Sequence, residues 1–137
     1  MSYASTLNAL EARLRDRWTE TAIVGEGDTF ERPNPPAAFV TFEFGDGAGR
    51  IAGFGNGVTT RTEGTLVLSV FAPVGAAGLI REAVERLAAL FPTGGGIGDA
   101  RFLGAPRFGR VLPADGDGGW IVGDVEIPFS VDCLETV

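Results

Sequence analysis

The feature that most constrains this fold is a long alternation of apolar and polar side chains near the C-terminal end. Over residues 120–133, one set of alternating positions is apolar: Ile121, Val125, Ile127, Phe129, Val131 and Cys133. The other set holds Trp120, Asp124, Glu126, Ser130 and Asp132. Successive side chains of a strand point to opposite faces of a sheet, so this alternation predicts one long strand with one buried face. We expect Cys133 in the core and Trp120 to be partly exposed.

Two further segments have the pattern of strands. Residues 38–44 (AFVTFEF) place Val40, Phe42 and Phe44 on one face. Residues 65–71 (TLVLSVF) are apolar on both faces, which predicts a central strand that is covered on both sides. An interrupted strand is expected over residues 100–111, and the GDGG stretch at 116–119 predicts a hairpin turn.

Two helices are predicted by apolar side chains at helical spacing. The first covers residues 5–18, with Ser5 or Thr6 as N-cap, and its stripe is Leu7, Leu10, Leu14 and Trp18. The second covers residues 76–91, and its stripe is Ile80, Val84, Leu87 and Phe91. A pair between Glu82 and Arg86 is expected on its surface. The chain is therefore expected to form a single α+β domain over residues 1–137. Its two layers would be a mixed, largely antiparallel sheet of about four strands and two helices packed on one face.

The glycine-rich stretch from Gly45 to Gly64 has neither a helical period nor a clear strand alternation. We expect a long loop at 45–64, and a loop of this length in a compact domain is commonly functional. Its bulky or cationic side chains are Arg50, Ile51, Phe54 and Arg61. Because arginine and aromatic residues often dominate interface energies, these four are the candidate protein–protein interface.

The composition argues against most enzyme classes. The chain has no histidine, and all eleven of its basic residues are arginine. A Ser-His-Asp or Cys-His site, a zinc site with imidazole ligands and a lysine-containing phosphate loop are therefore impossible. We expect no enzymatic activity, no cofactor and no metal.

Charge and cysteine content point to a soluble protein made in a cytoplasm. The net charge of −7 argues against a dedicated nucleic-acid binder. The single cysteine cannot form an internal disulfide, which fits a reducing compartment. No apolar run approaches the ~20 residues that span a bilayer.

Three local motifs resemble ligand sites but fit them poorly. The glycines of TGGGIGD at 93–99 have the wrong spacing for a dinucleotide loop and follow a helix. Asp115 and Asp117 resemble the start of a calcium loop, but Trp120 stands where that loop needs glycine. Asp124 and Glu126 share a strand face and could do acid–base chemistry in a pocket, or could simply be solvated or paired with arginine.

Several stretches resemble those of a known protein family, both in local sequence and in their order along the chain. They are the opening helix MSYASTLNALEARL, a proline-containing approach to AFVTFEF, the strand and turn TLVLSVFAPVGAAG, the helix end Leu90-Phe91-Pro92, and the closing strand VEIPFSVD. This pattern resembles the small tail-terminator proteins of long-tailed bacteriophages, some of which are known only as phage-related proteins of unknown function. The resemblance spans nearly the whole chain and brings no catalytic residues.

The resemblance implies a homo-oligomeric ring, usually of six subunits, in the virion tail. Such a ring is assembled in the bacterial host cytoplasm, caps the tail-tube protein and joins the tail to the head-completion protein. DNA passes through its channel without specific binding, and no membrane is involved. One alternative is a related head–tail connector or minor tail protein. Another is a small ligand-binding or hydrolytic α/β domain that uses Asp124, Glu126 and a serine.

Overall fold

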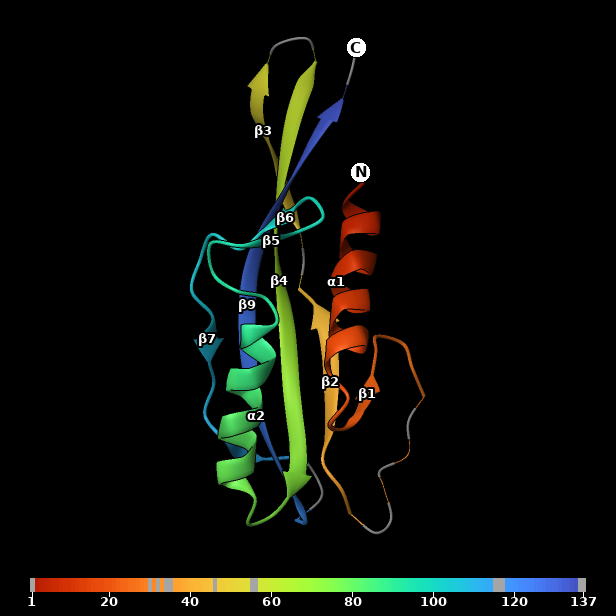
Figure 1. Ribbon diagram of the computed structural model, residues 1–137, viewed down its shortest axis with the longest axis vertical. Coiled ribbons are helices and arrows are strands. Elements are labelled where there is room, and N and C mark those ends of the chain that lie inside the picture. The colour runs from red at the N-terminus through yellow and green to blue at the C-terminus, as the bar shows by residue number, and fades with distance from the viewer. Residues whose placement is uncertain are drawn as a thin grey trace.

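The computed structural model describes residues 2–29, 31, 33, 36–45, 47–54, 57–114 and 118–135 (Figure 1). Its elements, in chain order, are α1 (Tyr3–Arg17), β1 (Ala22–Val24), β2 (Phe39–Phe44), β3 (Ala48–Phe54), β4 (Val58–Pro73), α2 (Ala77–Ala89), β5 (Gly96–Ile97), β6 (Ala100–Arg101), β7 (Arg107–Phe108), β8 (Leu112–Pro113) and β9 (Trp120–Glu135). The mixed α+β prediction is confirmed.

A single nine-stranded sheet is built around the two long strands β4 and β9. They pair antiparallel along their whole length, from Val58↔Glu135 to Pro73↔Trp120. The other edge of β4 pairs with β2 and then with β3, whereas the other edge of β9 pairs with β6, β7 and β8. Only the β1–β2 pair is parallel among the described strands. The prediction of about four strands is an undercount, because strands of two or three residues are too short to show a period.

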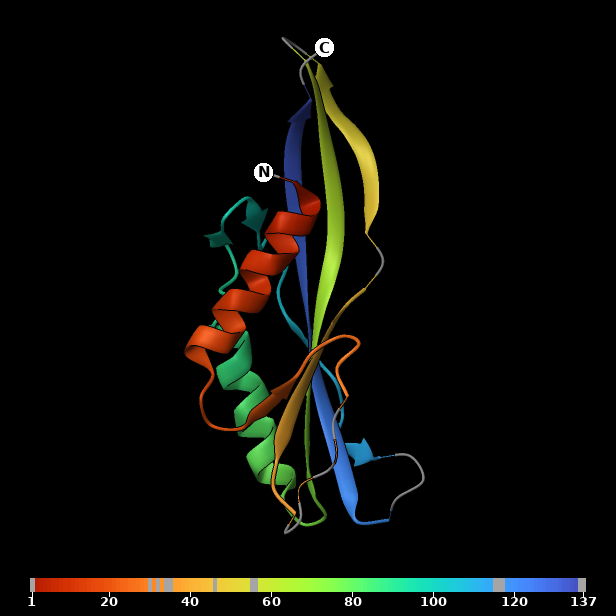
Figure 2. The same ribbon diagram turned by 90° about the vertical axis from the view of Figure 1, so that its right-hand side faces the viewer.

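Both helices cover the same face of the sheet (Figure 2). Beneath them, the alternate residues of the long strands are fully buried: Leu66, Leu68 and Val70 of β4, and Val125, Ile127 and Val131 of β9. Leu10 and Leu14 of α1 and Ile80 and Leu87 of α2 close this core, as the helical spacing predicted. Trp18 is buried too. No helix in the described part of the chain is long and apolar enough to cross a membrane.

The first helix begins earlier than predicted. Ser2 is the N-cap, and it exchanges hydrogen bonds with Ser5 in a capping box, so neither Ser5 nor Thr6 is the cap. The second helix also differs in one surface contact. Arg86 donates two hydrogen bonds to Glu20, which precedes β1, in place of the predicted pair with Glu82.

The glycine-rich stretch at 45–64 is not a loop, and that prediction is wrong for its described residues. β3 and the first part of β4 form an antiparallel hairpin, with a register shift between Ile51 and Gly53. Because glycine has no side chain, these residues show no alternation of apolar and polar positions. They do allow another segment to approach the strands closely. A Cβ at Gly47 or Gly64 would lie 2.7 Å from the Tyr3 hydroxyl oxygen. The glycines therefore let the start of α1 lie against the hairpin.

Tyr3 gives a testable feature of this packing. The Tyr3 hydroxyl is buried and has no hydrogen-bond partner within the described part of the chain. Burial raises the pKa of Tyr3. Its ring stacks on Phe129 at 6.4 Å between centroids. An unsatisfied buried hydroxyl destabilises a fold, so we expect Tyr3→Phe to raise the free energy of unfolding by up to about 1 kcal/mol. Urea unfolding measures this. Tyr3→Leu, which removes the ring, should lower it, and a destabilised Tyr3→Phe would contradict the prediction.

Trp120 is buried, contrary to the expectation of partial exposure. It lies with Phe39 and Ala114 in a second, smaller core on the face opposite the helices. The Phe39 ring stacks on Phe71 at 4.9 Å and meets Trp120 edge-on at 5.5 Å. The chain around β8 therefore covers this end of the open face. Elsewhere on that face Val67 is only half-buried, so β4 is covered less fully than its two-sided apolar pattern predicted. Of the predicted turn at 116–119, residues 116 and 117 lie outside the described residues, and Gly118 and Gly119 lie in a turn before β9.

Candidate protein interface

The candidate interface residues lie on an arm that extends beyond the helix-covered body (Figure 1, Figure 2). The arm consists of β3, residues 58–64 of β4 and residues 129–135 of β9. All three strands pair antiparallel, which gives this projection a continuous hydrogen-bond ladder. The arm thus holds Arg50, Ile51 and Arg61 on regular backbone.

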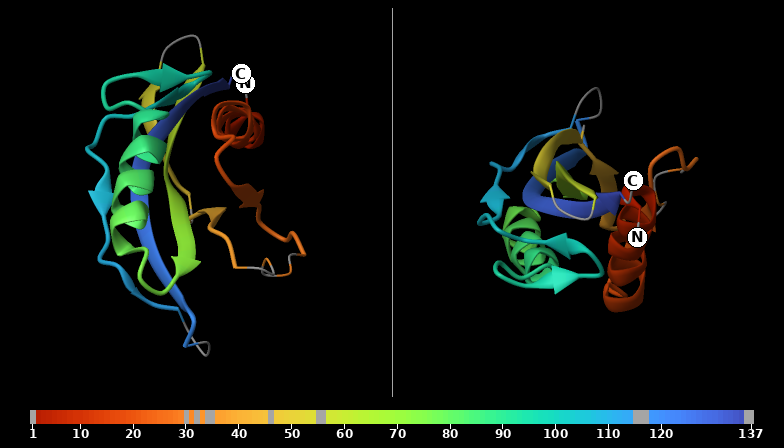
Figure 3. Two further views of the ribbon diagram at one scale, coloured as in Figure 1. Left: turned by 60° about the horizontal axis from the view of Figure 1, so that its bottom comes forward. Right: turned by 90° about the horizontal axis from the view of Figure 1, so that it is seen from above.

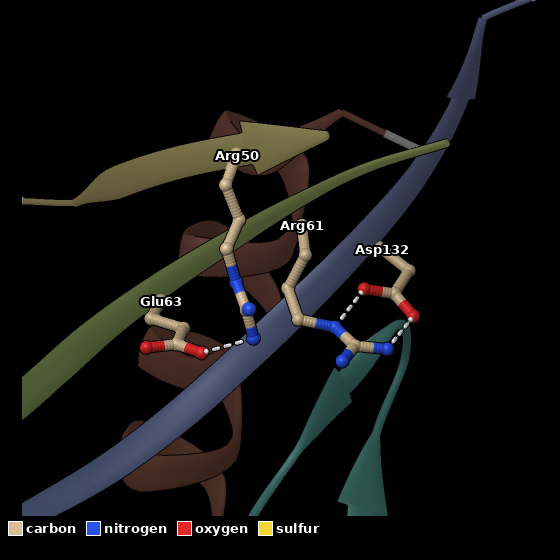
Figure 4. Close-up of polar contacts among 4 residues, drawn as sticks. All are labelled: Arg50, Arg61, Glu63 and Asp132. Atoms are coloured by element: carbon tan, nitrogen blue, oxygen red, sulfur yellow. Dashed lines mark hydrogen bonds and ion pairs between the residues drawn. The ribbon is translucent and has the colours of Figure 1, made fainter. Parts of the chain in front are cut away.

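Arg61 forms the best-defined polar contact of the arm (Figure 4). Its guanidinium donates to both carboxylate oxygens of Asp132, from Nε at 2.7 Å and from Nη2 at 2.9 Å. The two residues are direct partners across β4 and β9. The hydrogen bonds and the charge of Arg61 hold the pKa of Asp132 below its usual value. This bidentate pair holds the guanidinium in one orientation.

Arg50 stands directly opposite Arg61 across β3 and β4, which would place two like charges side by side. Each arginine has its own carboxylate. Arg50 Nη2 lies 3.0 Å from Glu63 Oε1, two residues along β4, and both side chains are well exposed (Figure 4). The sequence patterns identified the two arginines but missed Glu63 and Asp132. Alternation placed Asp132 on the polar face, but only strand register reveals its partner.

The four candidate residues do not form one patch. Arg50 and Arg61 lie on the face opposite the helices, and Ile51, the next residue on β3, faces the other way and is 60% exposed. Leu134, also on the arm, is 65% exposed and shares the face of Asp132. The Phe54 side chain lies outside what the structure describes. Exposed apolar side chains on both faces of a projection are typical of a surface that meets a partner.

A groove of about 390 Å³ lies at the base of the arm. Its lining residues are Ala48, Glu63, Gly64, Thr65, Leu103, Gly104, Pro128, Phe129 and Ser130. Its one ionisable side chain, Glu63, is paired with Arg50. Asp124 and Glu126, the carboxylates that the hydrolytic alternative needs, do not line it. No group of three or more histidine, cysteine, aspartate or glutamate side chains among the described residues could hold a metal ion. Cys133 is half-buried against the core.

Comparison with known proteins identifies a fold. No family model matches the chain, and no curated protein matches it. One solved structure, which carries no functional name, is similar over 98% of this chain and 99% of its own length, with a TM-score of 0.68 and 18% sequence identity. The two chains share a fold. At this identity the likeness bears on architecture alone, and activity and partners have to be argued from the residues.

Proposed function

We propose that this chain is a structural subunit of a bacteriophage tail. In this proposal it is a tail terminator, which forms a ring on the end of the tail tube and joins it to the head-completion protein. The resemblance of its stretches to that family supports the proposal. The observation that carries it is the arm, because strands β3, β4 and β9 run past the helix-covered core and expose Ile51 and Leu134 at their far end.

The arm adds little to the core of the domain. On β4, the side chains of the arm before Gly64 are half-buried or exposed, whereas the alternate residues from Gly64 onward are buried. On β9, burial continues as far as Val131, and the residues after it are half-buried or exposed. A long projecting edge is a risk for non-specific strand pairing, which natural proteins normally limit. An exposed arm of this kind is expected where it binds a partner. The end of a tail tube presents the same partner subunit repeatedly.

The charges of the arm suit a ring through which DNA moves. Arg50 and Arg61 are each neutralised within the chain by Glu63 and Asp132. The net charge of the chain is −7. Binding to DNA depends on cations that neutralise phosphates, so a surface with few free cations holds DNA weakly. A connector elsewhere between head and tail would share this property. Electron microscopy of the protein mixed with tail tubes separates the two roles, because a terminator caps tube ends.

The double change Arg50→Ala with Phe54→Ala tests the arm. We expect the melting temperature of the monomer to change little, because the Arg50–Glu63 pair is exposed and such pairs contribute little to stability. We expect ring formation or tube capping to weaken clearly, with uncapped tubes growing to irregular length in an assembly assay.

Arg17→Ala is a matched control, since Arg17 also forms an exposed ion pair, with Asp16, but lies on α1. It should leave assembly unchanged. Normal capping by the double variant would refute the role of the arm. Loss of folding in the double variant, with normal assembly of its folded fraction, would place these side chains in the core instead.

A further inference from the structure

The two lateral edges of the sheet differ in chemistry. β7 and β8 lie along the outer side of β9, and β1 lies along the outer side of β2, at opposite ends of the strand order. The views in Figure 1 and Figure 3 agree on this placement. We call the side formed by residues 100–114 and the exposed surface of α2 the arginine edge. The side formed by residues 20–29, residue 31 and β2 is the acidic edge.

The arginine edge holds arginines that form no ion pair with another described residue. Carboxylates also lie nearby, since Glu126 of β9 is the cross-strand partner of Arg107 and Glu85 of α2 faces the same cleft as Arg81. Residues 100–114 contain three arginines and no carboxylate: Arg101, Arg107 and Arg110. Elsewhere Arg15, Arg17, Arg50, Arg61 and Arg86 are each in an ion pair. The described arginines outside these pairs are Arg13 and four on the arginine edge, namely Arg81 of α2 and the three above. Among the described residues, arginine outside ion pairs is therefore concentrated on one side of the molecule.

The same edge also exposes large apolar side chains. Leu103 is 68% exposed, Phe108 is 51% exposed and Leu112 is 49% exposed. A cleft of about 580 Å³ runs between α2 and the segment 108–111, and its lining includes Arg81, Phe108 and Arg110 together with one carboxylate, Glu85. Arginine beside an exposed aromatic ring is the composition that is enriched at protein–protein contacts.

The acidic edge has the opposite charge. Residues 20–31 contain four carboxylates and no basic residue: Glu20, Glu26, Asp28 and Glu31. Glu43 adds a carboxylate on β2, at the point where β2 extends past β1. Some of these groups serve the fold, since Glu20 pairs with Arg86, Asp28 pairs with Arg15, and Glu26 accepts a hydrogen bond from the Phe44 backbone N–H. Glu31 and Glu43 are exposed and in no ion pair with another described residue.

We propose that the arginine edge of one copy docks on the acidic edge of a second copy. Two arginine edges would repel each other, as would two acidic edges, so the charges favour a head-to-tail contact. Such a heterologous contact repeats from copy to copy and gives a closed ring when the rotation closes. Phe108 and Leu112 would form the apolar centre, and Arg107 and Arg110 would meet Glu31 and Glu43 at its rim. The inference rests on the proposed ring and names its subunit interface.

Charge-reversal variants test this contact. One variant carries Arg107→Glu and Arg110→Glu, and the other carries Glu31→Arg and Glu43→Arg. Each alone should place like charges in every contact and weaken self-association at least about tenfold, as measured by sedimentation velocity. Mixed in equal amounts, the two should associate again, because each reversed edge then meets a reversed partner. The chain with all four changes should associate by itself.

Controls separate edge chemistry from folding and from net charge. Thermal unfolding by circular dichroism checks that each variant folds. Arg13→Glu with Arg17→Glu changes the net charge as much as the first variant does, but on α1, away from β7 and β8, and should not weaken association. Failure of the mixture to recover, or normal association of either reversed variant, would overturn the inference, as would a wild-type chain that stays monomeric at every concentration. If ring formation responds to the charge reversals as expected but the rings never cap tail tubes, the proposed function would be refuted and the proposed subunit interface would be supported.

Discussion

Leu68→Ala should lower the free energy of unfolding by about 2–5 kcal/mol. Leu68 has no exposed surface and lies at the middle of β4, between Phe42 of β2 and Val125 of β9. Both neighbouring strands and the helix layer hold it, so the surroundings cannot collapse into the space that the smaller side chain leaves. The loss would be a large fraction of the roughly 5–15 kcal/mol that stabilises a typical domain. Urea unfolding followed by circular dichroism measures it.

Leu134→Ala is the matched control, because it makes the same chemical change on β9 at a position that is 65% exposed. We expect its free energy of unfolding to stay within about 0.5 kcal/mol of that of the wild-type chain. Equal losses at the two positions would mean that the arm is as tightly packed as the body. That result would contradict the division of the molecule into a core and a projecting arm.

Long, periodic segments were predictable from the sequence alone. The alternation over 120–133 predicts β9, because a period of two over so many residues has no helical interpretation. The central part of its apolar set, from Val125 to Val131, is buried, whereas Ile121 and Cys133 at its ends are half-buried. The stripes of the two helices were equally clear. These segments carry most of the core, and they fix the two-layer architecture.

The remaining elements have no local signal. β3 is rich in glycine, and it is a strand because the first part of β4 offers it a partner and Tyr3 needs glycine to approach. β5 to β8 are two-residue strands that exist because β9 or a neighbour supplies their hydrogen bonds. Trp120 is buried by Ala114, six residues before it, and by Phe39, which is remote in sequence. Strand register, which sequence patterns do not give, decides each of these features.

The candidate site was likewise predictable from the sequence only in part. Arginine and aromatic content directed attention to residues 50–61, but the contacts of these arginines depend on Asp132, about seventy residues away, and on Glu63. The arginine edge has a signal that could have been found in the sequence, since residues 100–114 hold three arginines without a carboxylate. Its significance depends on the acidic edge at the other end of the sheet, and only the strand order establishes that relation.

Gly123→Ala should also destabilise the fold, by about 1–3 kcal/mol, because it overpacks the contact between β9 and α2. A Cβ at Gly123 would lie 2.5 Å from Ile80 Cγ2 and 3.3 Å from Val111 Cγ2. Ile80 is fully buried and its branched side chain has few rotamers, so it cannot turn aside. The helix has to move away from the sheet. Gly53→Ala is the control, since a Cβ at that strand glycine meets nothing within 4 Å, and it should have little effect.

A double-mutant cycle with Ile80→Ala checks that this clash is the cause. Ile80→Ala alone should destabilise the wild-type chain by creating a cavity beside Gly123. In the Gly123→Ala background, the same change removes the methyl group that the new Cβ meets. The double variant should therefore lose less stability than the sum of the single losses, by at least about 0.5 kcal/mol. Strict additivity would show that α2 and β9 accommodate the extra methyl group elsewhere, and the explanation of Gly123 as a packing requirement would then be wrong.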